Sequence, residues 1–222
     1  MRKILIAACA AFLGFMTTAA EAGFQYGFSC ITNRNVSNAS VGSQLKVDVI
    51  DPGWGNQVRF EFTNTGAKAG SITDIYFHDA NNLLASFGWI QNQTGVNFVT
   101  GANPATLSDG SAVGFVTDTP LNTQSTSIAY GVNPGEKVGI TLNLGAGKMF
   151  SDVIAAISTG AIRMGVEMTG FSYLGTESFV STTTNTSPVP VTPEPSALAL
   201  GGLACLGLLR RRRKPTTEVE QV

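Results

Sequence analysis

The stretch Val58-Arg59-Phe60-Glu61-Phe62-Thr63 places a large apolar side chain at every second position, with charged or polar residues between. Successive residues of a β-strand point to opposite faces of a sheet, so this period of two predicts one buried face and one wet face. The same alternation recurs at residues 45–49, 138–144 and 162–169. Repeated strands of this kind are typical of antiparallel sheets.

Other segments rich in β-branched and aromatic residues predict further strands at residues 25–32, 72–78, 112–116, 125–130, 171–174 and 177–180. Turn-forming residues separate the strands, as in Asp51-Pro52-Gly53 and Asn133-Pro134-Gly135. We therefore expect one all-β domain over residues 23–180, in which about nine strands form an antiparallel β-sandwich. A jelly roll is the alternative arrangement.

Two parts of this domain depart from the alternating pattern. Residues 80–110 form a long connection rich in Gly and Asn, which indicates either a functional loop or an extra hairpin, with residues 87–90 and 96–99 as the candidate strands. One short helix is expected at residues 151–157, with Ser151 as its N-cap. Val153, Ile154 and Ile157 would form its apolar face.

The N-terminus has the three parts of a secretory signal in order. Arg2-Lys3 is followed by an apolar run over residues 4–16 and then by Ala20-Glu21-Ala22. Small residues at Ala20 and Ala22 match the cleavage site of signal peptidase, so residues 1–22 are expected to be removed before Gly23. A lipoprotein-type site at Cys9 is the alternative, but it leaves only five apolar residues before the cysteine.

The charge of the remaining body argues against a nucleic-acid partner. Residues 23–180 carry seven basic and eleven acidic side chains, a net charge of −4. Binding to a phosphate backbone needs a basic surface, which a mildly acidic domain does not supply.

The sequence offers little for catalysis. Cys30 is the one cysteine between residues 23 and 180, and its place in an apolar alternation predicts a small core residue. His78 is the one histidine of the chain, and no motif of a metalloprotease, serine hydrolase or phosphate-binding loop occurs. We therefore expect a protein that is not an enzyme and needs no cofactor.

The acidic residues around His78 do not form a predictable site. Asp79 would lie on the opposite face of the strand, and Asp74 would lie about 13 Å along it on the same face. A solvated strand end is the expected setting of His78. No ligand spacing supports a metal ion here, nor calcium at a loop carboxylate such as Asp51 or Asp109.

Two tryptophans next to glycines are the candidate ligand contacts of the domain. Trp54 lies between Gly53 and Gly55, and Trp89 follows Gly88. Exposed tryptophans beside polar residues are how β-sandwiches often hold sugars, whereas a buried tryptophan contributes to the core because of its large apolar area. The second interpretation is the more common fate of a tryptophan.

The composition changes after residue 180. Residues 181–192 are dominated by Ser, Thr and Pro and show neither a helical period nor alternation. Such a composition predicts an extended linker between the domain and the C-terminal segment of the chain.

An uncharged apolar run at residues 196–209 is followed by five cations, Arg210, Arg211, Arg212, Arg213 and Lys214. As a helix, these 14 residues span about 21 Å, less than the roughly 30 Å of a bilayer core. Snorkelling of the flanking cations extends a short span, and the basic cluster marks the cytoplasmic side. We expect a single transmembrane helix with residues 215–222 as a cytoplasmic tail.

Pro193, Glu194 and Pro195 precede this apolar run, and the order of motif, short span and basic cluster over residues 193–214 resembles the PEP-CTERM sorting signal. That resemblance implies an exported protein of a Gram-negative bacterium that is the substrate of an exosortase acting near the three-residue motif. The protein would be held transiently at the inner membrane with its body in the periplasm. It would then reach the outer surface or the extracellular space.

The body also resembles a domain that recurs in exported PEP-CTERM proteins, through residues 58–66, 72–79, 170–171 and 177–180. This second resemblance brings no catalytic residues. Together they imply a surface or extracellular-matrix protein associated with exopolysaccharide or biofilm. The alternative is a secreted hydrolase or a carbohydrate-binding module that acts on matrix polysaccharide.

Overall fold

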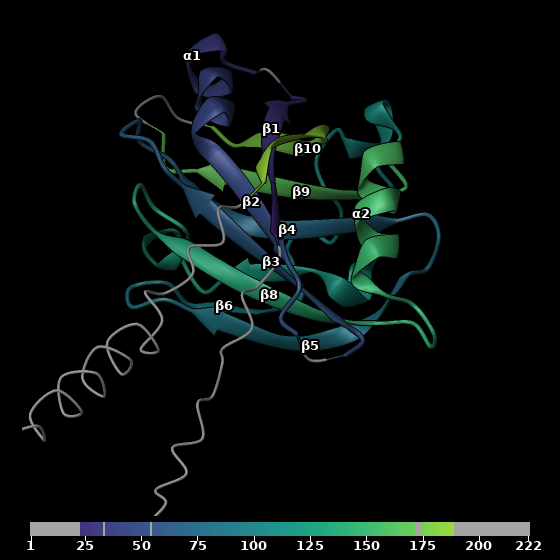
Figure 1. Ribbon diagram of the computed structural model, residues 1–222. Helices are drawn as coiled ribbons and strands as arrows, with labels where there is room; N and C mark the ends of the chain where they lie inside the picture. The colour runs from purple at the N-terminus through teal and green to yellow at the C-terminus, as the bar shows by residue number, and fades with distance from the viewer. Residues whose placement is uncertain (1–22, 33, 54, 172–174, 189–222) are drawn as a thin grey trace, which may run out of the picture.

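The computed structural model describes residues 23–32, 34–53, 55–171 and 175–188, which fold into ten antiparallel strands and a few short helices (Figure 1). The strands are β1 (Gly23–Cys30), β2 (Leu45–Ile50), β3 (Gln57–Asn64), β4 (Ser71–Asp79), β5 (Leu84–Asn92), β6 (Phe98–Thr100), β7 (Thr123–Ser125), β8 (Lys137–Leu144), β9 (Ile162–Thr169) and β10 (Glu177–Pro188). The helices are α1 (Val36–Ala39) and α2 (Phe150–Thr159), with 3-10 turns η1 (Ser40–Gln44), η2 (Gly110–Val113), η3 (Thr119–Leu121) and η4 (Ile128–Tyr130). The predicted all-β antiparallel fold is confirmed.

All ten strands belong to one sheet, in the order β5-β8-β3-β2-β1-β10-β9-β4-β7-β6. The predicted β-sandwich, with two separate sheets, is therefore wrong. The reason is β1, which pairs with β2 along one side and with β10 along the other. It therefore joins by backbone hydrogen bonds the two halves that a sandwich would keep apart.

The sheet curves until its halves face one another across a single core. Phe60 of β3 and Phe77 of β4 lie five places apart in the strand order, yet their ring centroids are 5.0 Å apart in an edge-to-face contact. Phe62 meets the same ring at 6.2 Å. These aromatic residues are fully buried, and each contributes about 3 kcal/mol or more through burial and ring contacts.

The two edges of the sheet approach each other at the connection between β5 and β6. The expected hairpin of residues 87–90 and 96–99 is wrong, because β5 pairs with β8 and β6 pairs with β7. The Asn92 side chain replaces the missing ladder: its Nδ2 donates to the Phe98 carbonyl at 3.2 Å and its Oδ1 accepts the Phe98 amide at 2.9 Å. The sheet is thus nearly closed.

β4 is buried on both faces, which explains why its sequence lacks a clear alternation. Its inner side faces the main core, while Tyr76 on the outer side packs with Leu107, Phe115 and Val180 in a second cluster. The covering segment contains η2, so the strand predicted at residues 112–116 is wrong. The strand predicted at residues 125–130 is also wrong, since β7 ends at Ser125 and η4 follows.

α2 confirms the predicted helix but not its predicted cap. The residue at the N-cap is Met149, whose amide donates to the Asp152 carboxylate at 2.9 Å, so that Ser151 lies within the first turn. A carboxylate at the third helical position satisfies one of the orphan donors of a helix start. Val153 and Ile157 are fully buried in the core.

β10 continues through residues that were predicted as linker. The strand runs to Pro188, and Ser181 and Asn185 are partners of Phe28 and Tyr26 in β1. The prediction of an unstructured segment from residue 181 is therefore wrong up to residue 188. Backbone pairing needs no apolar alternation, and register shifts along β1 let this polar segment join the ladder.

The first and last described residues lie together, because Phe24 pairs with Pro188. The opposite end of β1 leads into α1 and η1, so these two helical turns lie at the far end of the sheet (Figure 1). The predicted signal peptide, residues 1–22, and the predicted membrane segment lie outside the described residues. Within the described ranges, no helix is long and apolar enough to cross a membrane.

Candidate functional site

The sorting-motif residues Pro193, Glu194 and Pro195 lie outside the described part of the chain. The same holds for Ala20 and Ala22, for Trp54, and for the basic cluster, which comprises Arg210, Arg211, Arg212, Arg213 and Lys214. Of the residues predicted from sequence to touch a ligand, Trp89 can be placed. It lies on β5 and exposes 37% of its surface.

Trp89 stands on the outer face of the sheet in a row of paired residues. It is the partner of Thr141 on β8, which is in turn the partner of Arg59 on β3. The next residue of β5 that faces outward is Gln91, which pairs with Gly139 of β8. A Cβ at Gly139 would lie 3.3 Å from the Gln91 Cβ and 3.6 Å from the Arg59 Cδ, so glycine lets these two side chains close over β8.

The outer face around this row is polar. Lys137 pairs with Glu61 at 2.9 Å, and Gln25 donates to Asp48 at 2.9 Å. A partly exposed aromatic ring beside hydrogen-bonding groups can receive the apolar face of a sugar ring, and the polar groups can bind its hydroxyls. We refer to Trp89, Gln91, Thr141 and Arg59 as the outer-face row.

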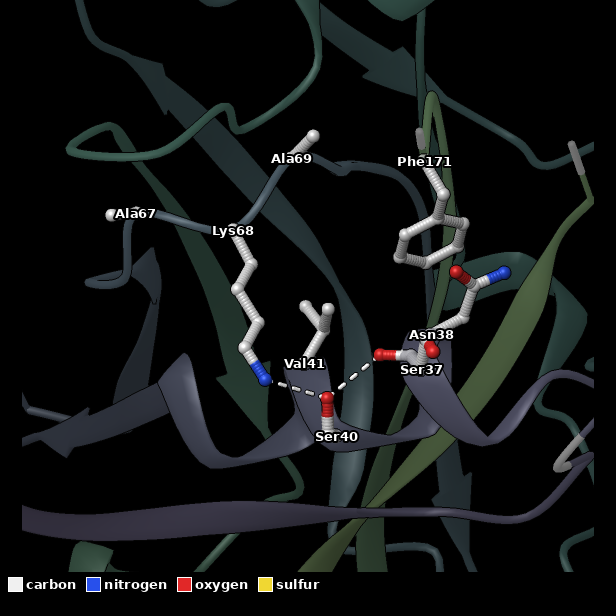
Figure 2. Close-up of a pocket in the computed structure, with 8 residues that line it drawn as sticks. All are labelled: Ser37, Asn38, Ser40, Val41, Ala67, Lys68, Ala69 and Phe171. Carbon is white, nitrogen blue, oxygen red and sulfur yellow. Dashed lines mark hydrogen bonds between the residues drawn. The ribbon is translucent and has the colours of Figure 1, made fainter. Parts of the chain in front are cut away.

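A separate pocket of about 510 Å³ lies at the α1 end of the sheet (Figure 2). The residues that line it are Ser37, Asn38, Ser40, Val41, Ala67, Lys68, Ala69 and Phe171. Lys68 Nζ donates to Ser40 Oγ at 2.6 Å, and Ser40 Oγ donates to the Ser37 carbonyl at 2.7 Å. No sequence motif indicated this pocket, because its residues come from three segments far apart in the chain.

A buried carboxylate fixes one wall of this pocket. Glu177 of β10 is 1% exposed and accepts the amides of Arg34 at 3.0 Å and Asn35 at 2.8 Å. It also accepts the Thr32 hydroxyl. These bonds hold the segment that leads from β1 into α1, and thereby set the position of the pocket wall formed by residues 37–41.

A buried amide pair fixes the opposite wall. The Gln44 Nε2 donates to Asn64 Oδ1 at 2.7 Å and to the Lys68 carbonyl at 3.0 Å. The Asn64 Nδ2 donates to the Gly70 carbonyl at 3.0 Å. The β3–β4 connection is therefore held at its start and at its end, which keeps Lys68 above the pocket.

His78 does not lie at a solvated strand end as the sequence predicted. It is buried, its Nδ1 accepts the Val116 amide at 3.0 Å, and its ring centroid lies 5.5 Å from that of Phe115. The prediction was wrong because the long connection before β7 folds back over the end of β4. His78 thus has a structural partner in the backbone.

Another cavity, of about 400 Å³, lies beside His78 and is lined by Asp79 and Asp118. Asp79 Oδ2 accepts the Leu84 amide at 2.6 Å and its Oδ1 accepts the Asn81 amide at 3.2 Å. Burial, and then the charge of Asp79, raises the pKa of the Asp118 carboxyl. Asp79 is committed to a turn, so this pair offers one available carboxyl group rather than two.

Two further carboxylates, Asp74 and Glu167, face each other across β4 and β9 as direct register partners. Both are buried, at 7% and 3% exposure. Glu167 accepts the amide and hydroxyl of Ser108 at 3.0 and 2.6 Å, while burial, followed by a smaller contribution from the Glu167 charge, raises the pKa of Asp74 to about 6. Ser108 and the Asn103 amide contact the pair, and neither carboxylate lines either of the two pockets described above.

The remaining chemical groups of the described ranges form no metal site: no set of three or more His, Cys, Asp or Glu is placed to hold an ion there. Asp51 accepts the Gly53 amide at 2.9 Å, and Asp109 lies 3.8 Å from Arg34. Cys30, predicted as a small core residue, is half-buried and packs against the main core from its edge.

Comparison of the chain with protein-family models, with curated proteins and with solved structures found no match. The fold and the sites above therefore rest on the residues themselves. The sequence indicated Trp89 through its glycine neighbour, but it carried no sign of Glu177, Gln44 or Asn64 as the residues that hold the pocket walls.

Proposed function

We propose that this chain is an exported bacterial surface or extracellular-matrix protein, sorted by an exosortase through a PEP-CTERM signal. The observation that carries the proposal is the ordered run of motif, short apolar segment and basic cluster over residues 193–214, preceded by a signal-like N-terminus. In this proposal the chain is the substrate of a processing enzyme, and its body is a binding or structural module.

The arrangement of the domain ends supports such processing. β1 begins at Gly23, directly after the proposed signal-peptidase site, so cleavage there removes no residue of the sheet. β10 ends at Pro188, five positions before Pro193. Because these two ends pair, both processing segments would join the domain at one end, and that end would face the membrane.

Replacing Pro193, Glu194 and Pro195 with alanines is expected to retain the protein at the inner membrane. Two prolines around a glutamate keep the backbone out of a helix and leave a charged group for recognition, which three alanines do not. Fractionation of the native host, followed by immunoblotting, measures the distribution. Replacing Thr216 and Thr217 in the tail with alanines is the control, and the same distribution for all three proteins would contradict the proposal.

The outer-face row favours polysaccharide as the material that the domain contacts. Trp89 is 37% exposed on a polar face, where Gln91 is exposed and Arg59 is half-buried while Thr141 beneath them is fully buried. Trp89 is not among the residues of the main core. Exposing a large apolar side chain to water is unfavourable. Contact with extracellular polysaccharide would account for the exposed part of Trp89.

Replacing Trp89 with alanine is expected to weaken retention on the host's own exopolysaccharide by about fivefold, since stacking contributes about 1 kcal/mol. Affinity electrophoresis of the full chain in detergent through gels containing the polysaccharide measures the effect. Tyr130→Ala, at another exposed aromatic residue, is the matched control. Equal mobility of wild type and Trp89→Ala would remove the outer-face row from the proposal.

A secreted hydrolase is the second candidate, and the cavity lined by Asp79 and Asp118 is the observation in its favour. A raised pKa keeps a carboxyl group protonated to higher pH, and a general acid must be protonated to donate its proton. Release of reducing ends from the exopolysaccharide by the wild type, abolished in Asp118→Asn, would favour this candidate over a binding module.

A further inference from the structure

The pocket in Figure 2 lies at the end of the sheet opposite to Gly23 and Pro188. β1 runs from that paired end to Cys30, and the chain then enters α1 and η1, whose residues line the pocket. If the paired end faces the membrane, the pocket opens away from it. Its volume of about 510 Å³ is within the range of about 300–1,000 Å³ that is usual for ligand sites.

One side of the pocket is polar and positively charged. The Lys68 ammonium lies 2.6 Å from the Ser40 hydroxyl, and none of the eight lining residues is acidic. Within the described ranges Lys68 has no carboxylate partner. A cation that faces a pocket without a counter-ion is an attractive position for an anionic ligand group.

The pocket also has apolar lining residues. The Phe171 ring lies across the opening from Lys68 in Figure 2, while Ala67 and Ala69 flank Lys68 and Val41 lies near its ammonium. Asn38 lies beside Phe171 in Figure 2 and is 3% exposed. Its Oδ1 is on the Phe171 side, whereas its Nδ2, which has no hydrogen-bond partner among the described residues, points away from Lys68. The Oδ1 is therefore the Asn38 atom that can accept a ligand hydroxyl.

We propose that this pocket binds a hexuronic acid unit of an acidic polysaccharide. The Lys68 ammonium binds the carboxylate, Ser37, Ser40 and Asn38 bind ring hydroxyls, and the aromatic wall at Phe171 meets the apolar face of the sugar. A neutral sugar would leave the Lys68 ammonium without a counter-ion, and a small carboxylic acid would leave the aromatic wall without a contact. The inference rests on the proposed function, because it names the class of matrix polymer that an exported module of this kind would meet.

The Lys68–Ser40 contact is not well suited to hydrolysis. A lysine that activates a serine must be held neutral in a desolvated setting, whereas Lys68 is exposed. A charged ammonium that binds a ligand anion is compatible with that exposure.

Isothermal titration of the full chain in detergent, with an oligomer of hexuronic acid, tests the proposal. Binding is expected for the wild type, at least about tenfold weaker in Lys68→Gln and largely restored in Lys68→Arg, because a charged hydrogen bond is lost and regained. Lys148→Gln is the matched control, since Lys148 is an exposed lysine near the opposite end of the sheet. A neutral hexose oligomer of equal length is expected to bind at least about tenfold more weakly, because it lacks the carboxylate.

Equal affinities for the acidic and neutral oligomers, or equal uronate binding by wild type and Lys68→Gln, would overturn the proposal. Tight binding of acetate or of a short peptide carboxylate in place of the uronate would overturn it as well. The outcome for the pocket is separable from that for the proposed function. If uronate binding does not depend on Lys68 but retention on exopolysaccharide still depends on Trp89, only the pocket proposal is wrong. If neither dependence is found, contact with polysaccharide is wrong as well.

Discussion

Replacing Glu177 with alanine is expected to lower the free energy of unfolding by about 3 kcal/mol. The carboxylate is 1% exposed and receives hydrogen bonds from the Thr32 hydroxyl and from the amides of Arg34 and Asn35. Alanine removes the acceptor from all three donors at once. Each of these three partly buried donors loses a charged acceptor at a cost of about 1 kcal/mol, and the three share one segment.

The effect of this substitution should extend to the pocket, because the Glu177 bonds hold the segment that leads into α1. Denaturant unfolding of the full chain, followed by tryptophan fluorescence, gives the change in stability. Hexuronic acid affinity gives the effect on the pocket. Glu177→Gln, which keeps an acceptor but removes the charge, is expected to fall between wild type and alanine.

Glu61→Ala is the matched control for Glu177→Ala. Glu61 also carries a carboxylate on a strand, but its partner is the exposed Lys137 at 2.9 Å. Surface ion pairs of this kind contribute about 0–1 kcal/mol. If the two alanine variants lose equal stability, the role assigned to Glu177 is wrong.

The parts of the fold that the sequence predicted are those where one face of a strand meets water. β3 alternates between buried and half-buried positions along its whole length, so its period of two is visible. β4 is buried on both faces by contacts with a segment some 30 residues later in the chain, and no local pattern records such a cover. The same folded-back segment explains the wrong setting predicted for His78.

The closure of the sheet was also beyond local patterns. It depends on β1 pairing with β10, whose partners Phe28 and Ser181 lie at opposite ends of the domain sequence. The Ser- and Thr-rich composition after residue 180 indicates a linker when considered alone. Its role as a strand follows from an edge of β1 that would otherwise carry unpaired backbone groups.

The candidate pocket likewise could not be predicted from local sequence patterns. Lys68, Ser40 and Phe171 have no spacing in sequence that links them, and each is an ordinary residue alone. Trp89 was a candidate from sequence because it follows Gly88 in a polar segment, although burial in the core was the more common expectation for a tryptophan. Its outward orientation, however, depends on the register with Thr141.

Replacing Asp74 with asparagine is expected to stabilise the protein at pH 8 by up to about 3 kcal/mol and to bring no gain at pH 3.5. Burial first, and the nearby Glu167 charge to a lesser extent, raise the pKa of Asp74 to about 6 from 3.8, against hydrogen bonds from Thr73 and the Asn103 amide that lower it. Because the folded-state pKa is the higher one, the protonated group contributes stability that is fully present below pH 3.8. That contribution is lost as the pH rises through about 6.

The asparagine variant keeps an acceptor for Thr73 and Asn103 but cannot ionise, so the pH-dependent loss should disappear with it. Thermal unfolding of both proteins between pH 3.5 and pH 8 measures this: the wild type should lose stability relative to Asp74→Asn mainly between about pH 4 and pH 7. Asp109→Asn, at an exposed loop carboxylate, is the control and should follow the wild type. A constant difference between wild type and Asp74→Asn across this range would show that Asp74 does not carry a buried charge next to Glu167.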